Sequence, residues 1–452
     1  MSIFEPAYLK NMTIINEGHA FVGTVMLTCG RIQAIIPQKE NVNIAESNGI
    51  LIPGVIDTHV HFREPGLTEK GDIVSESRAA AAGGVTTYFD MPNCQPTTTT
   101  PREWVKKTAT AENKSRVNFA CFFGATNDNA DELKRLDKRR VPGIKLFMGA
   151  STGNMLVDNK ETLRKIFQSS SLPIVAHCED SDIINANAHR YRSLLGNDIP
   201  IKYHPLIRSE EACVRSTALA IRMAQETGAR LHIAHVSTAR ELQMIAEAGD
   251  NVTAEACLSH LLFCDEDYSR LGSRIKCNPA IKTRADRDAL RRALNDGTIT
   301  TVATDHAPHL LKDKEGGCLE AASGMPMVQY SLPAMLTLAD EGILSYERVV
   351  ELMCHAPARL FGIQWRGFIR EGYYADFVYV KRTKHTVNKD DIISKCGWSP
   401  LEGRTLNWRV GMTLCNGKCV YNTNEITNAA GKTIFYDQID DDVRGQAVTF
   451  SR

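Results

Sequence analysis

Two histidines, His59 and His61, stand two residues apart in Val55–Phe62, a stretch of strand length that alternates apolar and polar residues. Successive side chains of a strand point to opposite faces, so both imidazoles and the following Arg63 share one face. Two imidazoles placed in this way can bind one metal ion. The turn formers Glu64-Pro65-Gly66 follow directly. This pattern predicts a metal site where a strand opens into a loop.

Further candidate ligands stand at the ends of other apolar stretches: Lys145 in Gly-Ile-Lys-Leu-Phe, His177 in Ala-His-Cys-Glu-Asp, His235 in Ala-His-Val-Ser, and Asp305 in Thr-Asp-His-Ala-Pro-His. A single buried histidine more often bonds a backbone carbonyl than a metal. Four histidines, a lysine and an aspartate at five strand ends form a convergent set of ligands, and we interpret them as one metal centre.

The elements that must position these residues alternate between apolar strand candidates and helical stretches such as residues 75–82 and 209–227. This alternation is typical of a parallel α/β barrel, whose active sites lie at the C-terminal ends of the strands. The predicted fold class is therefore α/β, with a (β/α)8 TIM-like barrel. Its eight strands are predicted at Val55–Phe62, Thr86–Pro92, Val117–Ala125, Ile144–Met148, Ile174–Cys178, Leu231–Val236, Val252–Ala256 and Thr301–Thr304.

Both ends of the chain carry short strand patterns separated by turn residues. Residues 21–27 and 32–36 flank a turn near the N-terminus, and residues 412–421 form a hairpin pattern around Asn416-Gly417. Neither end is long enough for a domain of its own, so we expect both to combine into one small β-sandwich. The predicted division is residues 1–52 and 360–452 for the sandwich and tail, and 53–359 for the catalytic barrel.

Composition narrows the function classes. The 452 residues are 43% hydrophobic, and 53 basic side chains balance 53 acidic ones, which argues against a nucleic-acid or membrane partner. Thirteen cysteines without any Cys-x-x-Cys predict reduced thiols and a cytoplasmic location, and Cys415 and Cys419 are interpreted as flanking the hairpin turn rather than binding metal. An N-terminus that carries Glu5 and no long apolar run does not predict a signal peptide.

Together these motifs resemble the amidohydrolase superfamily, and within it the cyclic amidohydrolases dihydroorotase, allantoinase and dihydropyrimidinase, from about Gly30 to Asp376. The resemblance implies two Zn2+ ions bridged by a carbamylated lysine and a hydroxide. It implies that His59 and His61 hold the more buried zinc and that His177 and His235 hold the second. It further implies that Lys145 carries CO2 as the bridging carbamate and that Asp305 both binds the buried zinc and shuttles the proton. An aspartate bridge, as in many bacterial dihydroorotases, is the alternative to the modified lysine.

The residues around the ligands indicate which cyclic amide is expected. In dihydroorotases an arginine at the position of Arg63 grips the substrate carboxylate with residues that match Asn93 and His309, and Asn278 matches a residue that contacts the ring. We therefore expect reversible hydrolysis of (S)-dihydroorotate to N-carbamoyl-L-aspartate, in pyrimidine biosynthesis. Allantoinase or dihydropyrimidinase activity and a non-catalytic relative are the alternatives. A homo-oligomer such as a dimer is expected, and association with aspartate transcarbamoylase stays open.

Neighbouring residues receive lesser roles. The stretch Glu255–His260 matches the family pattern after strand seven only in part, so His260 is given no role beyond an indirect contact. Glu179 and Asp180 are expected to orient groups around them. The segment 323–326 is expected at the mouth of the site.

Overall fold

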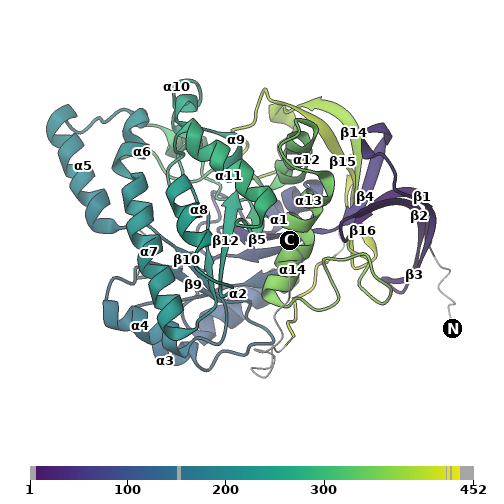
Figure 1. Cartoon of the computed structure of the whole chain (residues 1–452), viewed down its shortest axis with the longest axis horizontal. Helices are drawn as coiled ribbons and strands as arrows, with labels where there is room; N and C mark the ends of the chain where they lie inside the picture. The colour runs from purple at the N-terminus through teal and green to yellow at the C-terminus, as the bar shows by residue number, and fades with distance from the viewer. Residues whose placement is uncertain (1–6, 150–153, 424, 428–429, 438–452) are drawn as a thin grey trace.

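The computed structural model describes residues 7–149, 154–423, 425–427 and 430–437. Within these ranges a parallel α/β barrel makes up most of the molecule, and a mainly antiparallel sheet from both ends of the chain lies beside it (Figure 1). In this described part, no helix combines the length and the apolar character that crossing a membrane requires. The fold class predicted from the sequence is confirmed.

The barrel strands run parallel in two hydrogen-bonded groups, ordered β5-β6-β7 and β8-β9-β10-β11-β12-β13. The third predicted strand is interrupted at Phe122 and forms two strands, β7 and β8. Strand β7 lies at the edge of the first group and β8 at the edge of the second, so the chain passes from one group to the other here. The strands are β5 (Val55–Val60), β6 (Val85–Asp90), β7 (Asn118–Cys121), β8 (Phe123–Gly124), β9 (Ile144–Phe147), β10 (Ile174–His177), β11 (Leu231–Ile233), β12 (Val252–Cys257) and β13 (Thr301–Ala303).

The seam between the first and last strands is closed mainly by a buried carboxylate. Asp57 on β5 accepts hydrogen bonds from the Thr304 hydroxyl at 2.6 Å and from the Thr304 and His59 backbone N–H groups at 3.2 Å. The His61 backbone N–H donates to the His306 carbonyl at 2.7 Å. Burial raises the pKa of Asp57 to about 6, against these hydrogen bonds. The seam brings the strand that carries His59 next to Asp305.

Several barrel strands end earlier than the sequence predicts. Strand β11 stops at Ile233 and β13 at Ala303. His235 has φ of 39° and Asp305 has φ of 47°, and Arg63, beyond β5, has φ of 67°. Such left-handed backbone does not continue a strand and costs a non-glycine residue on the order of 1–3 kcal/mol. Three predicted site residues therefore stand at turns that aim their side chains.

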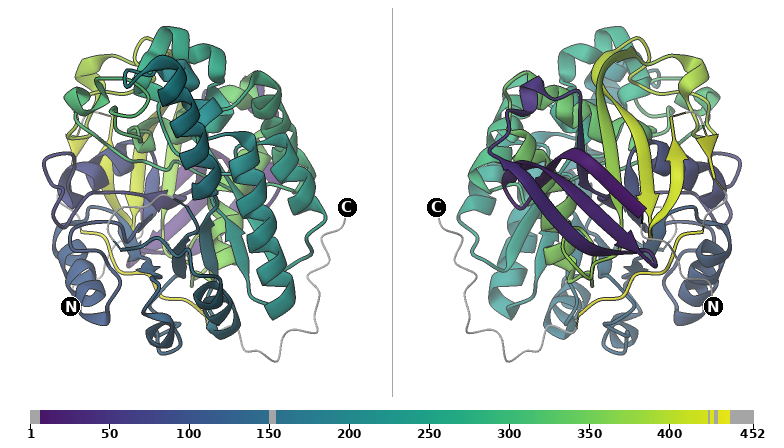
Figure 2. Two further views of the ribbon diagram at one scale, coloured as in Figure 1. Left: turned by 90° about the vertical axis from the view of Figure 1, so that its left-hand side faces the viewer. Right: turned by 90° about the vertical axis from the view of Figure 1, so that its right-hand side faces the viewer.

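Helices surround the barrel (Figures 1 and 2). Their starts follow ordinary capping chemistry: Asp72 accepts from the Ser75 N–H at 2.8 Å, and Ser209 caps the predicted helix after residue 209. The longer helices are α1 (Ile73–Ala82), α2 (Pro101–Lys114), α4 (Lys160–Ser169), α5 (Ser181–Leu195), α7 (Glu210–Thr227), α8 (Ala239–Ala246), α11 (Arg284–Asp296) and α12 (Ser331–Asp340). Shorter ones are α3 (Ala130–Leu133), α6 (His204–Ile207), α9 (Leu258–Leu262), α10 (Tyr268–Leu271), α13 (Tyr346–Val350) and α14 (Ala356–Phe361).

The second sheet joins the two ends of the chain in the order β17-β16-β15-β14-β4-β1-β2-β3 (Figure 2, right). Strand β4 pairs with β1 on one side and with β14 on the other, so N-terminal and C-terminal strands meet at its centre. The strands are β1 (Ala7–Asn16), β2 (His19–Thr28), β3 (Arg31–Glu40), β4 (Gly49–Pro53), β14 (Phe377–Thr386), β15 (Thr405–Cys415), β16 (Lys418–Asn422) and β17 (Glu425–Ile426).

Side chains from both halves of this sheet share one apolar cluster, which includes Val25, Leu51, Phe377 and Leu414. The predicted hairpin at Asn416-Gly417 joins β15 to β16. All thirteen cysteines are free, including Cys415 and Cys419 beside that turn. The domain boundaries predicted between residues 52 and 53 and between residues 359 and 360 stay a prediction.

The segment between β14 and β15 reaches from the sheet to the barrel mouth. Ser394 donates to Glu76 at 2.6 Å, and Trp398 donates its indole N–H to the His309 carbonyl at 2.7 Å. Glu76 in turn contacts the ring of His306, next to Asp305, at 2.8 Å. The segment thereby supports the loop after β13, which carries Asp305 and His309, both directly and through Glu76 on α1.

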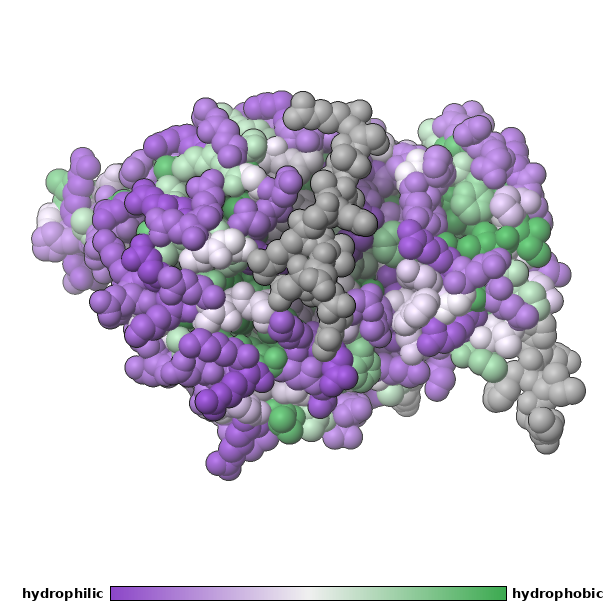
Figure 3. Space-filling view, turned by 60° about the horizontal axis from the view of Figure 1, so that its bottom comes forward, coloured by the Kyte–Doolittle hydropathy of each residue, from purple (hydrophilic) through white to green (hydrophobic). Residues whose placement is uncertain are grey.

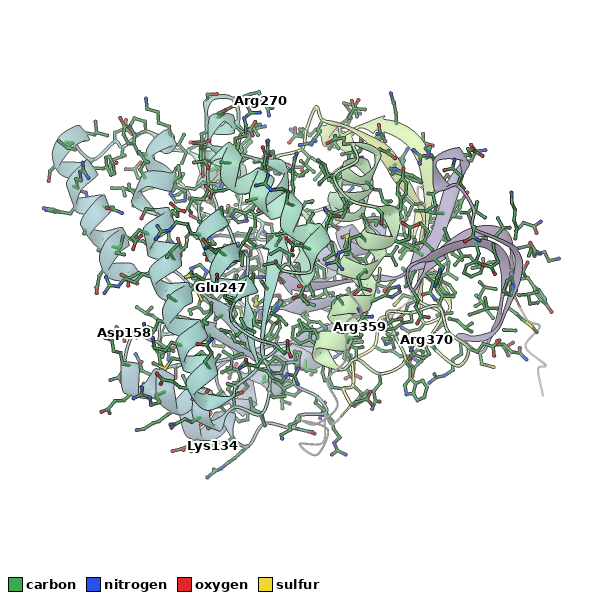
Figure 4. The ribbon with its side chains drawn as sticks, in the orientation of Figure 1. Lys134, Asp158, Glu247, Arg270, Arg359 and Arg370 are labelled. Carbon is green, nitrogen blue, oxygen red and sulfur yellow. The ribbon has the colours of Figure 1, made fainter. Side chains whose placement is uncertain are left out.

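The surface mixes both signs of charge, as the balanced composition predicts. Hydrophilic side chains cover most of the face in Figure 3. Of the six charged residues labelled in Figure 4, Lys134, Glu247 and Arg270 lie apart from one another, whereas Arg359 and Arg370 both face the Phe368 ring, at 5.7 and 4.3 Å.

Candidate metal centre and substrate pocket

The first and last barrel strands bring three candidate ligands together. His61 Nε2 lies 3.0 Å from Asp305 Oδ1, and His59 Nε2 lies 3.4 Å from the same oxygen. One donor atom from each of these three residues lies within 4.8 Å of those from the other two. Imidazole nitrogens and a carboxylate oxygen are the donors that zinc takes in proteins, so this group can hold one ion.

The fifth and sixth strands supply a second pair. His177 Nδ1 lies 2.9 Å from His235 Nε2, and the His235 ring centroid lies 5.3 Å from that of His59. Two nitrogens bound to one tetrahedral zinc at about 2.0–2.1 Å are roughly 3.4 Å apart, which is close to the observed separation. The structure therefore brings the two predicted histidine pairs side by side at one end of the barrel.

Lys145, on β9, lies in the barrel interior with no exposed surface. Its amine has no hydrogen-bond partner among the described residues, and the Phe147 ring lies 5.1 Å away. Burial lowers the pKa of Lys145, although Glu255 and Asp305 oppose the shift. A buried polar atom without a partner is rare in proteins, so this nitrogen points to a group that occupies the site.

Two more buried side-chain atoms without a partner in the described part of the chain belong to residues of this cluster: His235 Nδ1, and Oε1 of Glu179, which contacts His177. Leaving a buried donor or acceptor unpaired costs on the order of 1–3 kcal/mol, so three such atoms in one cluster are a large cost unless something binds there. The donor set fits metal ions and a polar substrate.

Three of the four histidines are held through one ring nitrogen while the other faces the cluster. His59 Nδ1 lies 2.7 Å from Glu255, His61 Nδ1 lies 2.8 Å from the amide oxygen of Asn93, and His177 Nε2 lies 2.9 Å from Glu179. Metal-binding histidines typically donate their second N–H to a carboxylate or amide in this way, which fixes the tautomer.

The protonation states also suit metal binding. Burial lowers the pKa of His61 to about 4, and it lowers the pKa values of His177 and His235 as well, so the rings are neutral and keep lone pairs. Burial alone would raise the pKa of Asp305, but the neighbouring His59 and His61 outweigh it and hold that pKa at about 2. The carboxylate is therefore ionised at neutral pH.

Beside this cluster, Arg63 follows His61 by two residues and is held by the loop after β13. Its Nη2 lies 3.0 Å from His309 Nε2, and its Nε donates to the Pro308 carbonyl at 2.9 Å. Lys70 Nζ lies 3.3 Å from the other ring nitrogen of His309. Within the described part of the chain no carboxylate lies within 4.0 Å of the Arg63 guanidinium, although burial lowers its pKa only to about 10. A buried, charged guanidinium without an acidic partner is a site for an anion.

The structure also gives contacts for several of the remaining predicted residues. The oxygen of Asn93 is engaged by His61, which leaves its NH2 group as the donor toward a ligand. His260 contacts the carbonyl of Pro279, the residue after Asn278, at 3.0 Å, and Asp180 caps α5 rather than orienting a site residue. The segment 323–326 passes His309: a Cβ on Gly324 would lie 3.1 Å from that ring.

Sequence reasoning missed Glu255 and Arg208 as contacts of the centre. Glu255 was seen only as part of an imperfect motif, and Arg208 was not singled out. Arg208 forms an ion pair with Glu179 and so holds the carboxylate that contacts His177. An acidic residue at an inward position of a predicted barrel strand was the available signal for Glu255.

Comparison with known proteins agrees with this geometry. The family model described as "Amidohydrolase family" matches residues 50–420. The chain belongs to the amidohydrolase family. It is 35% identical over 388 residues to a dihydroorotase of Halobacterium salinarum, a match that covers 85% of this chain and 89% of that protein. It is 32% identical over 424 residues to an allantoinase of Bacillus velezensis, covering 91% of this chain and 93% of that protein.

Among solved structures, the L-hydantoinase (dihydropyrimidinase) of Arthrobacter aurescens superposes with a TM-score of 0.88 at 27% identity, covering 95% of this chain and 99% of that one. These relatives place this amidohydrolase among the cyclic amidohydrolases. Their names divide between dihydroorotase, allantoinase and hydantoinase, and so leave the substrate open.

Proposed function

We propose that this amidohydrolase is a dihydroorotase, which hydrolyses (S)-dihydroorotate reversibly to N-carbamoyl-L-aspartate. The observation that supports this substrate is the buried Arg63 guanidinium, which has no carboxylate within 4.0 Å among the described residues and has His309 beside it. Dihydroorotate carries a carboxylate, whereas allantoin and dihydrouracil do not. A neutral ring would leave the guanidinium buried and unpaired, at a cost in affinity.

The proposed metal centre holds two zinc ions. His59, His61 and Asp305 hold one, and His177 and His235 hold the other. When bound, the ions supply an acidified water for attack and polarise the amide carbonyl of the ring. The neutral imidazoles and the ionised Asp305 described above support this division of ligands.

Lys145 is proposed to carry a carbamate between the two ions. Its buried, unpartnered amine and lowered pKa favour the neutral nucleophile that the modification needs. The amine nitrogen adds to the carbon of CO2 and loses one proton, which gives an anionic group with carboxylate geometry. A bare ammonium between two divalent cations would be repelled, so the modification also satisfies the charge of the site.

The remaining chemistry belongs to the protein side chains. Asp305 accepts the proton of the attacking water and delivers it to the ring nitrogen that leaves. Arg63, the NH2 group of Asn93 and His309 hold the carboxylate, and Asn278 contacts the ring. Fixing the substrate at its carboxylate places the scissile amide against the metal centre, which lowers the entropic part of the barrier.

The test is a parallel assay of the purified protein with dihydroorotate, allantoin and dihydrouracil, together with its metal content after purification without chelators. We expect turnover of dihydroorotate to exceed that of both neutral rings and two zinc ions per chain. A preference for allantoin or dihydrouracil would reject the dihydroorotase assignment and leave a cyclic amidase of another specificity. Activity with no bound metal would reject the metal centre.

A further inference from the structure

Glu255 lies inside the barrel on β12, with 1% of its surface exposed, and contacts residues of both histidine pairs. Its Oε1 lies 2.7 Å from His59 Nδ1, which is the shortest contact of any site histidine. The same oxygen accepts the backbone N–H of His235 at 3.3 Å. Its Oε2 accepts from the Thr58 hydroxyl at 3.3 Å. One carboxylate therefore joins the first, sixth and seventh strands.

The contact between Glu255 and His59 determines which nitrogen of the His59 ring can bind a metal. A carboxylate only accepts hydrogen bonds, so Nδ1 of His59 must carry a proton, and a ring that binds a metal has to do so through Nε2. Nε2 then carries the lone pair, and this is the nitrogen that faces Asp305 at 3.4 Å. Without Glu255 the ring could rotate or take the other tautomer, and the first metal position would lose a correctly placed ligand.

The contact with His235 acts through the backbone. His235 has φ of 39°, a conformation that non-glycine residues adopt only where their surroundings hold them. The N–H of this residue is the group that Glu255 holds, and the ring beyond it lies 2.9 Å from His177. Loss of the carboxylate would release this backbone and move a ligand of the second metal position.

We infer that Glu255 is a positioning residue that couples the two metal positions, because its carboxylate fixes a ligand of each. This inference rests on the proposed binuclear centre. It predicts a behaviour that loss of a single histidine ligand does not produce: zinc affinity should fall at both positions together.

Two substitutions separate the parts of this interaction. Glu255→Gln keeps an oxygen that can accept from His59 but removes the charge, and Glu255→Leu removes both. Glu241→Gln is a matched control, because Glu241 is equally buried and its contacts are with Thr217, Thr238 and the Ser237 N–H. Zinc affinity at each position is measured by competition with a chromophoric chelator, and thermal unfolding of the metal-free proteins shows that each variant is folded.

We expect about a tenfold loss of zinc affinity at both positions in Glu255→Gln and a loss approaching 100-fold in Glu255→Leu, the range typical of the partners of metal-binding histidines. The Glu241→Gln protein should bind zinc like the wild type even if its melting temperature falls. Unchanged affinity in a folded Glu255→Gln protein, or a loss confined to one position, would overturn the inference. If the wild-type protein itself binds no zinc, the binuclear centre fails instead.

Discussion

Replacement of Arg63 by asparagine is the most direct test of substrate choice. Residue 63 has φ of 67°, and asparagine is among the residues that tolerate this conformation best, so the backbone need not move. Asparagine also removes the buried guanidinium that is proposed to bind the substrate carboxylate. Losing one partner of a buried charge pair costs about 2–5 kcal/mol. Since about 1.4 kcal/mol is a factor of ten, kcat/KM for dihydroorotate should fall roughly 30- to several-thousand-fold.

Part of any loss will come from the protein, because Arg63 also donates to the Pro308 carbonyl and contacts His309. That part is common to all substrates. The measurement is therefore the ratio of kcat/KM for dihydroorotate to kcat/KM for dihydrouracil, in wild type and variant, with zinc content determined alongside. Arg102→Asn, at a side chain that is 81% exposed on α2, is the control.

We expect the ratio to collapse in Arg63→Asn while zinc content is unchanged, since Arg63 is not a proposed ligand. The Arg102→Asn protein should keep the wild-type ratio. An equal loss on charged and neutral rings would show that Arg63 is structural, and the substrate assignment would lose its support.

The remaining predictions concern the metal centre and proton transfer. His177→Ala should lower zinc content from two ions per chain to about one, as measured by elemental analysis; retention of both would remove His177 from the ligand set. Lys145→Ala should lose metal and activity, with partial rescue by short carboxylic acids that replace the carbamate. A native mass spectrum of the wild-type protein that shows no added CO2 would argue against the modification. Asp305, whose pKa the neighbouring histidines hold near 2 against the effect of burial, is ionised at neutral pH and ready to accept a proton. With a pKa of about 2 the carboxylate stays ionised across the neutral range, so its titration should leave ring opening unchanged there, whereas ring closure, which needs the protonated form, should speed up as pH falls toward that pKa. Ring closure that does not speed up on acidification would exclude Asp305 as the shuttle.

The strand ends could be predicted from the sequence because each candidate ligand follows an apolar stretch. In a parallel barrel all such ends meet at one rim, so placing His59, His177, His235 and Asp305 together requires only the correct strand assignment. What the pattern does not contain is where each strand stops. Positive φ at His235 and Asp305 ends the ladder early, and such conformations depend on contacts that form only in the folded chain.

The partners of the ligands were harder to predict for a related reason. Glu255 and His59 are 196 residues apart in sequence, and they meet across the barrel interior only after the sheet has closed. Neither the spacing of residues in the sequence nor the periodicity of apolar residues predicts such a pair. Similarly, the segment that carries Trp398 has no strand or helix pattern, yet it contacts the carbonyl of His309 from the other sheet.

The relatives share a fold and a type of reaction but differ in the substrates in their names, and this structure suggests a physical reason. The candidate metal-binding histidines and Lys145 stand on barrel strands or shortly after them, close to backbone that the sheet fixes. Arg63 and His309 stand in loops beyond the strand ends, where a substitution changes the surroundings of a substrate without moving the sheet. A cyclic amidohydrolase can therefore keep its fold and its reaction while the ring that it accepts changes. The buried guanidinium of Arg63, and not the similarity of the whole chain, is the feature on which the proposal of dihydroorotate as substrate depends.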